Sequence, residues 1–255
     1  MRRHQKLRAI VLHTVDYGES DRVVTLFTAE RGRLAAFARG ARASRRRFGG
    51  ALEPFTLLEV EATERRGADL PVLESAQVER GFGNLRADLA RIACASYACE
   101  LARELVREAE PHPDLFALLA AYLGGLDAAP ATAAGLRAFE LGALRAAGLA
   151  PRLDACARCG KVPEAGSRLR FDPGHGGLLC HRCAAFASPA ARGLSAATAR
   201  ALARLEAEGA HGGDLAPEEA RESREALTAF IEHHLGRRLR SRRFLDEMGP
   251  ALIRR

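Results

Sequence analysis

The sequence lacks several features that mark common classes of protein. It has no tryptophan and only three tyrosines, and Lys6 and Lys161 are its only lysines. No stretch approaches the roughly 18 to 20 uninterrupted apolar residues of a membrane-spanning helix. The basic start is not followed by the apolar run and cleavage site of a secretory signal. We therefore expect a soluble, cytoplasmic protein without a membrane partner.

The motifs of common enzyme classes are also missing. The sequence contains no GxxxxGKS/T, HExxH or GxSxG pattern, and Gly160-Lys161-Val162 lacks the hydroxyl that would hold Mg²⁺. Acidic residues are numerous but do not form the compact set that two-metal nuclease chemistry needs. The sequence therefore predicts a protein that is not an enzyme. An active site assembled only by the fold is the alternative.

Four of the six cysteines form two CxxC pairs, Cys156–Cys159 and Cys180–Cys183, with 20 residues between the pairs. A turn at Asp172–Gly177 lets the intervening segment fold back, which would close a tetrahedral shell of four sulfurs suited to Zn²⁺. Four protein ligands leave no position for a reactive water, so we expect one structural zinc ion per chain. Two disulfides or metal-free cysteines are the alternatives. For Cys94 and Cys99, inside a helical pattern, we expect buried thiols.

The formal net charge of +7 indicates an anionic partner, and the basic residues gather in two places. Residues 31–47 hold seven arginines and no acid, interspersed with small residues. Such a loop can follow a phosphate backbone, and an aromatic ring beside it can stack on a base. The predicted DNA contacts in this segment are Arg33, Arg39, Arg42, Arg45, Arg46, Arg47 and, for stacking, Phe48. A solvated loop is the alternative.

The second basic cluster, residues 237–243, has five arginines in seven positions at a predicted helix end. We expect Arg238, Arg240 and Arg242 to contact DNA as well. A helix C-terminus favours cations without any ligand, which is the structural alternative.

The hydropathy pattern divides the chain near residue 80. Five short apolar or alternating runs precede this point: Leu7–Thr14, Asp21–Thr28, Arg33–Ala38, Phe55–Glu61 and Val72–Val78. They predict a five-stranded barrel over residues 1–80, for which the OB-fold is the natural candidate and an SH3-like barrel the alternative.

The helical period takes over after Asn84. It predicts an α-helical domain over residues 81–255, interrupted by the zinc-binding element at 152–187. The predicted helices cover about 85–108, 114–126, 132–147, 195–208 and 217–239, and a basic tail follows them. The expected fold class is therefore α+β: an N-terminal OB-fold barrel, then a helical bundle with an inserted Cys₄ zinc ribbon or knuckle.

Segments along nearly the whole chain resemble the RecO family of recombination mediators and DNA repair proteins. Tyr17–Asp21 with Val24–Thr28 resembles its N-terminal YGESD…TLFT signature, and Ala38–Arg42 its ARGAR segment. Gly148–Pro151 leads into the cysteines as it does in the family, and Leu239–Leu245 resembles the C-terminal signature. The near-absence of lysine departs from the family, where lysine and arginine are mixed.

The resemblance implies a non-enzymatic protein of DNA repair and recombination, cytoplasmic and associated with the bacterial nucleoid during repair. Such proteins bind single- and double-stranded DNA, anneal complementary strands and engage the C-terminal tail of single-stranded-DNA-binding protein. They act with RecR and, indirectly, promote loading of RecA.

An acidic tail that ends in apolar residues needs an arginine beside an apolar groove. Arg137 and Arg145, on the predicted helix with Phe139, Leu141 and Leu144, are the expected contacts. Two other functions fit parts of the sequence: a zinc-ribbon module that recognises structured RNA, and a zinc-stabilised nuclease or nucleotidyltransferase. The first would not anneal strands, and the second would show Mg²⁺-stimulated turnover.

Overall fold

The computed structural model describes residues 2–44, 46–65, 67, 69–164 and 166–253. The chain forms two compact units, Met1–Ala129 and Pro130–Arg255. The first unit therefore contains two helices in addition to the barrel, whereas the sequence pattern changes near residue 80. No helix in the described part of the chain is long and apolar enough to cross a membrane.

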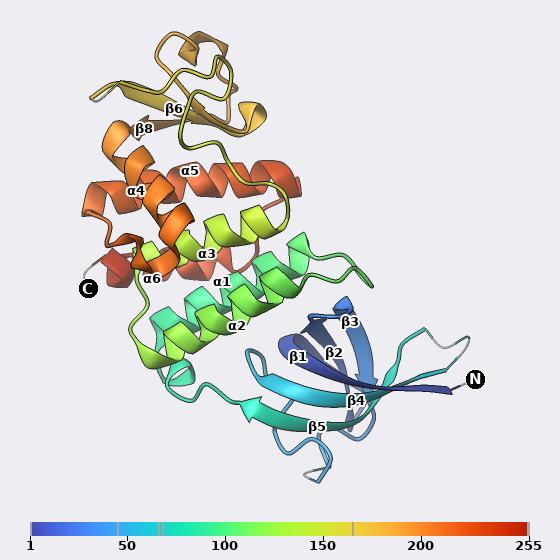
Figure 1. Cartoon of the computed structure of the whole chain (residues 1–255). Coiled ribbons are helices and arrows are strands. Elements are labelled where there is room, and N and C mark those ends of the chain that lie inside the picture. The colour runs from blue at the N-terminus through green and yellow to red at the C-terminus, as the bar shows by residue number, and fades with distance from the viewer. Residues whose placement is uncertain (1, 45, 66, 68, 165, 254–255) are drawn as a thin grey trace. The chain divides into compact units, whose positions relative to one another are not determined.

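The first unit begins with five strands that close into a barrel in the order β1-β2-β3-β5-β4 (Figure 1). The strands are β1 (Arg2–Tyr17), β2 (Asp21–Thr28), β3 (Gly32–Ala38), β4 (Leu57–Arg65) and β5 (Val72–Arg80). The long β1 pairs with β4 through Arg2–Ile10 and with β2 through Ala9–Tyr17. All pairings are antiparallel except that of β3 with β5, where Phe37 lies opposite Val72.

Alternation of buried and partly exposed residues explains why these segments are strands. Every second residue of β3 is buried, beginning at Gly32 and ending at Ala38. The inward-facing residues form the barrel core, which includes Leu7, Val11, Val24, Leu26, Leu34, Val60 and Leu73. One face of each strand thus fills the barrel, as a period of two residues requires.

Two helices complete the first unit, α1 (Leu89–Leu105) and α2 (Pro113–Ala128). The predicted first helix starts later than expected, because the Asp88 side chain caps α1 by accepting hydrogen bonds from the amides of Ala90 and Arg91. The ring of Phe116 on α2 meets that of Phe27 on β2 edge-to-face, with 5.6 Å between the centroids. Helix α2 is therefore packed on the barrel.

The second unit combines helices with a small sheet. Its helices are α3 (Ala133–Ala146), α4 (Ala196–Glu208), α5 (Pro217–Leu235) and α6 (Arg242–Ile253). The strands β6 (Arg168–Asp172), β7 (Gly177–Leu179) and β8 (Arg192–Ser195) form a sheet in the order β7-β6-β8. Phe171 of β6 packs against Phe230 of α5 at 5.4 Å between ring centroids, so the sheet rests on that helix (Figure 1).

The C-terminal segment differs from the sequence prediction. Helix α5 ends at Leu235 rather than near 239, because Gly236 takes a left-handed conformation with φ of 67°. The segment predicted to be a basic tail contains helix α6. Ser241 begins that helix by accepting a hydrogen bond from the amide of Leu245.

Candidate functional site: a four-cysteine centre and two arginine clusters

The two CxxC pairs lie together in the second unit. The sulfur atoms of Cys156, Cys159, Cys180 and Cys183 are all within 4.8 Å of one another. Cys159 is exposed, and the other three are buried. The predicted cluster is therefore present, and it can hold a metal ion.

The backbone explains how the pairs meet. Strands β6 and β7 form a hairpin, and β7 leads directly into Cys180. The first pair is fastened to this hairpin by hydrogen bonds from the Leu178 amide to the Arg152 carbonyl (3.0 Å) and from the Ala157 amide to the Leu178 carbonyl (2.6 Å). Gly177 permits the approach, because a Cβ atom there would overlap the backbone of Arg152.

Each pair turns tightly around its sulfurs. The Gly160 amide donates to the Cys156 carbonyl at 2.8 Å, and the Ala184 amide donates to the Cys180 carbonyl at 2.9 Å. Gly160 adopts φ of 73°, which favours glycine. These two turns place both sulfurs of each pair on the same side of the backbone.

The electrostatics of the centre favour a cation. Burial would raise the pKa of Cys156, but hydrogen bonds from the backbone of Cys180, Cys159 and Arg158 lower it to about 6. Burial and the three neighbouring sulfurs raise the pKa of Cys183 to about 12. The centre thus stabilises the thiolate of Cys156 and disfavours deprotonation of Cys183. A bound metal ion would favour deprotonation of both, because metal ligation requires thiolates. The remaining cysteines, Cys94 and Cys99, are buried on α1 as predicted.

Asp172 stabilises the turn that precedes β7, and sequence analysis did not single it out. Its buried carboxylate accepts hydrogen bonds from the Gly174 amide (2.9 Å), the Ser188 amide (2.7 Å) and the Ser188 hydroxyl (2.5 Å), and it lies 2.8 Å from Nδ1 of His175. Burial would raise the pKa of this carboxyl group, but the hydrogen bonds, led by those from Ser188, lower it to about 2. Asp172 thereby ties the hairpin to the segment that follows Cys183.

We expect Asp172→Asn to lower the free energy of unfolding by roughly 2 to 4 kcal/mol at pH 7, because the amide directs a donor at groups that already donate. The ionised carboxylate stabilises the fold fully above its unfolded pKa of about 4. The difference between wild type and variant should therefore shrink as the pH falls from about 4 toward 2. Chemical denaturation across this range measures it. Asp154→Asn is the control, since the Asp154 side chain is 80% exposed, and a loss equal to that of Asp172→Asn would contradict the assignment.

The N-terminal arginine loop follows β3 and covers residues 39–54. Of the predicted DNA contacts, Arg39, Arg42 and Arg46 are exposed and Arg47 is partly exposed, whereas Arg45 lies outside the described residues. Arg42 donates to the Glu19 carbonyl at 3.1 Å, and Arg47 donates to the Arg39 carbonyl at 2.7 Å. The described residues of the loop therefore present exposed guanidinium groups, and those of Arg42 and Arg47 are held by backbone carbonyls.

Two predicted contacts on this loop and on β3 are placed differently from the others. Arg33 donates to the Arg103 carbonyl at 3.3 Å and lies 3.5 Å from the Glu108 carboxylate. Phe48 is 2% exposed and belongs to the barrel core. The stacking role predicted for Phe48 is therefore wrong, because neither face of its ring is open to a base.

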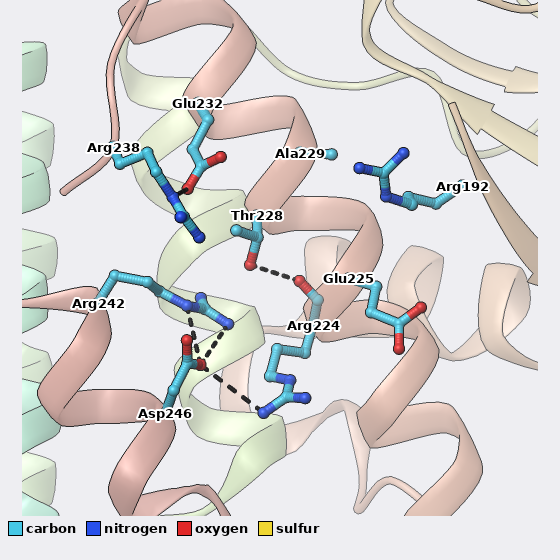
Figure 2. Close-up of a pocket in the computed structure, with 9 residues that line it drawn as sticks. All are labelled: Arg192, Arg224, Glu225, Thr228, Ala229, Glu232, Arg238, Arg242 and Asp246. Atoms are coloured by element: carbon cyan, nitrogen blue, oxygen red, sulfur yellow. Dashed lines mark hydrogen bonds and ion pairs between the residues drawn. The ribbon is translucent and has the colours of Figure 1, made fainter. Parts of the chain in front are cut away.

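Two arginines of the C-terminal cluster, Arg238 and Arg242, line a pocket of about 220 Å³ in the second unit (Figure 2). Arg238 is exposed and pairs with Glu232 at 3.0 Å, and Arg240 is exposed. Arg242, the first residue of α6, is 6% exposed and pairs with Asp246 at 3.1 Å, so the prediction that it contacts DNA is wrong.

Two further arginines line the same pocket, and no pattern in the sequence marks them. Arg192 comes from β8, and Arg224 from α5 reaches the carboxylate that Arg242 binds, with 3.7 Å to Asp246 (Figure 2). Neither belongs to the run of arginines at residues 237–243. The packing of β8, α5 and α6 brings them to the pocket.

The two arginines predicted to bind an acidic tail lie on α3 in different environments. Arg137 is 3% exposed, and its Nε lies 2.9 Å from Oε2 of the buried Glu140. The angle at this contact is poor, and Nη1 of Arg137 finds no hydrogen-bond acceptor among the described residues. Arg145 is exposed and donates to the Glu206 carbonyl at 2.9 Å. Arg145 is the accessible member of the two.

Comparison with known proteins identifies the class of protein. Residues 1–82 match the family model described as "Recombination protein O N terminal", and residues 86–243 match "Recombination protein O C terminal". The first match covers the barrel. The second covers the four-cysteine centre, the arginine cluster at residues 237–243, and Arg192 and Arg224. The two family models of recombination protein O therefore match the chain in order and together cover most of it.

Curated proteins named DNA repair protein RecO match this chain over nearly their full length. The chain is 66% identical to the DNA repair protein RecO of Anaeromyxobacter dehalogenans over 250 residues, which covers 97% of this chain and 98% of that protein. It is 51% identical to the DNA repair protein RecO of Myxococcus xanthus over 243 residues, covering 94% and 96%. The chain belongs to the RecO family of DNA repair proteins.

Proposed function

We propose that the protein is a non-enzymatic recombination mediator that binds single- and double-stranded DNA and anneals complementary strands. In this role it engages the C-terminal tail of single-stranded-DNA-binding protein and acts with RecR to promote RecA loading, in the bacterial cytoplasm at the nucleoid. The observation that carries the proposal is the acid-free arginine segment on the barrel, whose Arg39, Arg42 and Arg46 are exposed.

Annealing requires that two phosphate backbones approach each other without preference for base sequence. Contacts between guanidinium groups and phosphates neutralise charge and carry no sequence information, so an exposed arginine loop suits this task. The pairing of β3 with β5, which skips β4, is typical of a Greek-key barrel and supports an OB-fold. OB-folds bind single strands through a basic groove.

The four-cysteine centre is proposed to hold one structural Zn²⁺. Thiolate ligands in this number favour zinc among common cellular metals, and they leave no open coordination position. Cys156, Cys159, Cys180 and Cys183 would be the ligands. The ion would hold the β6–β7 hairpin against the first cysteine pair. Packing of the helices would also contribute to the stability of the second unit.

An acidic tail peptide would meet Arg145 first, because this guanidinium is exposed. Arg137 would contribute to binding only if its contact with Glu140 were replaced by a contact with a carboxylate of the tail. Its unsatisfied Nη1 supports such an exchange, since a buried donor without an acceptor is costly.

In the C-terminal cluster, Arg238 and Arg240 remain the proposed DNA contacts.

The experiment is annealing of two complementary labelled oligonucleotides coated with cognate single-stranded-DNA-binding protein. The tail of the coating protein is either intact or deleted, and no nucleotide is added. Fluorescence energy transfer between the two labelled strands measures annealing. We expect annealing only when the tail of the coating protein is intact. Absence of annealing with both coating proteins, together with tight binding of structured RNA, would replace the mediator proposal with the RNA-binding alternative.

A further inference from the structure

An exposed aromatic ring lies beside the four-cysteine centre. Phe186 is 56% exposed on a 3₁₀ turn (Ala184–Phe186) just after Cys183. The Arg158 guanidinium, from within the first CxxC pair, lies over this ring with its Cζ 3.2 Å from the centroid. The side chain of Arg158, from the first pair, thus stacks on the ring that follows the second pair, and both residues are exposed.

The backbone of the centre fixes both members of this stack. The Phe186 amide donates to the Cys183 carbonyl at 3.0 Å, and the Cys156 amide donates to the Lys161 carbonyl at 2.8 Å. Arg158 lies between these last two residues, within the turn that they close. Such preorganisation lowers the entropy cost of binding a ligand.

The surroundings of the stack are cationic. Residues 155–163 and 173–189 contain no aspartate or glutamate, although Asp154, Glu164 and Asp172 border them, and Lys161 and Arg182 there are exposed. Four thiolates with Zn²⁺ carry a net charge of −2, so neutralising the metal centre is one use for these cations. That use explains neither the open ring of Phe186 nor the guanidinium stacked on it.

We infer that the outer side of the two cysteine pairs is a contact for single-stranded nucleic acid. A base would stack on Phe186 and Arg158, and Lys161 and Arg182 would hold the adjacent phosphates. Aromatic rings and guanidinium planes both accept unpaired bases, whereas a duplex hides its base faces. The inference rests on the proposed function and gives it a second contact, on an element that lies outside the barrel.

The test measures binding of a fluorescent oligothymidylate to the full-length, zinc-loaded protein by anisotropy. We expect Phe186→Ala to weaken binding at least fivefold, the effect of losing one base stack, and Phe186→Trp to restore it. Arg158→Gln should weaken binding through the lost stacking partner, and Arg182→Gln should reduce the slope of log K against log salt by about 0.7, as expected for one lost phosphate contact. Val162→Ala, another exposed apolar residue of the element, and Arg200→Gln, an exposed arginine of α4, are the controls.

Zinc content, measured on every variant, separates the possible outcomes. Weakened binding with wild-type zinc content supports the inference. Loss of zinc in parallel with binding would assign the cations to the metal centre and overturn it. Wild-type affinity in Phe186→Ala and Arg158→Gln would also overturn it, while leaving the proposed function intact. If wild-type protein did not bind the oligonucleotide, the proposed function itself would fail.

Discussion

Cys156→Ser is expected to remove the metal from the four-cysteine centre and to unfold the element built around it. Cys156 is fully buried at the junction of both pairs, and its pKa is already lowered by three backbone groups. Structural zinc contributes about 10 to 16 kcal/mol of apparent binding energy in small finger peptides. Here the β6–β7 hairpin is paired through its backbone and Phe171 packs against Phe230, and neither contact involves the cysteine sulfurs. We therefore expect a smaller loss, of several kcal/mol.

Zinc stoichiometry by atomic absorption and thermal unfolding, with and without chelator, measure both effects. Chelation should lower the melting temperature of wild type and leave that of Cys156→Ser unchanged. Cys99→Ala is the control, since this buried cysteine lies on α1 in the other unit and should retain full zinc content. Full zinc content and unchanged melting in Cys156→Ser would remove this residue from the ligand set.

The second large effect is expected from neutralising the arginine loop. Changing Arg39, Arg42 and Arg46 together to glutamine removes three exposed charges and no buried contact. If each arginine contacts one phosphate of a single strand, the slope of log K against log salt should fall by about 2. The same relation predicts about 100-fold weaker binding at 0.1 M salt. Titrations of labelled single-stranded DNA at several salt concentrations measure slope and affinity together.

A charge-matched variant separates a local effect from the net charge of the protein. Arg107, Arg168 and Arg200 are exposed arginines outside the loop, and their combined change to glutamine lowers the net charge equally. In this control variant, the slope of log K against log salt should stay close to the wild-type value. Equal losses in the two triple variants would mean that DNA senses only the overall charge, which would refute the loop as a specific contact.

The sequence predicted those features that depend on local spacing. A CxxC pair makes its own turn, so the cluster required only that a hairpin return the second pair to the first. The alternation in β3 was visible because a strand with one buried face must alternate. Helix starts were less accurate, since the cap at Asp88 moved the start of α1.

The errors arose where distant segments decide burial. Phe48 has arginine and glycine neighbours, which suggested an exposed loop. However, the Ala76 amide of β5 donates to the Arg47 carbonyl at 2.9 Å, which draws the loop onto the barrel. Arg242 was misplaced because the run of arginines did not suggest helix α6, which pairs Arg242 with Asp246 and brings it beside Arg224 and Thr228 of α5. The α5 and β5 residues involved lie outside the local sequence of Arg242 and Phe48.

The long β1 strand has a consequence for synthesis of the chain on the ribosome. Its second half can pair with β2 as soon as the first hairpin emerges, but its first half waits for β4, whose residues begin at Leu57. The strand that closes against β3 is later still, since β5 ends at Arg80. Until then the nascent barrel has open strand edges, which pair readily with other chains. The first 80 residues must therefore leave the exit tunnel before the barrel can protect itself from aggregation.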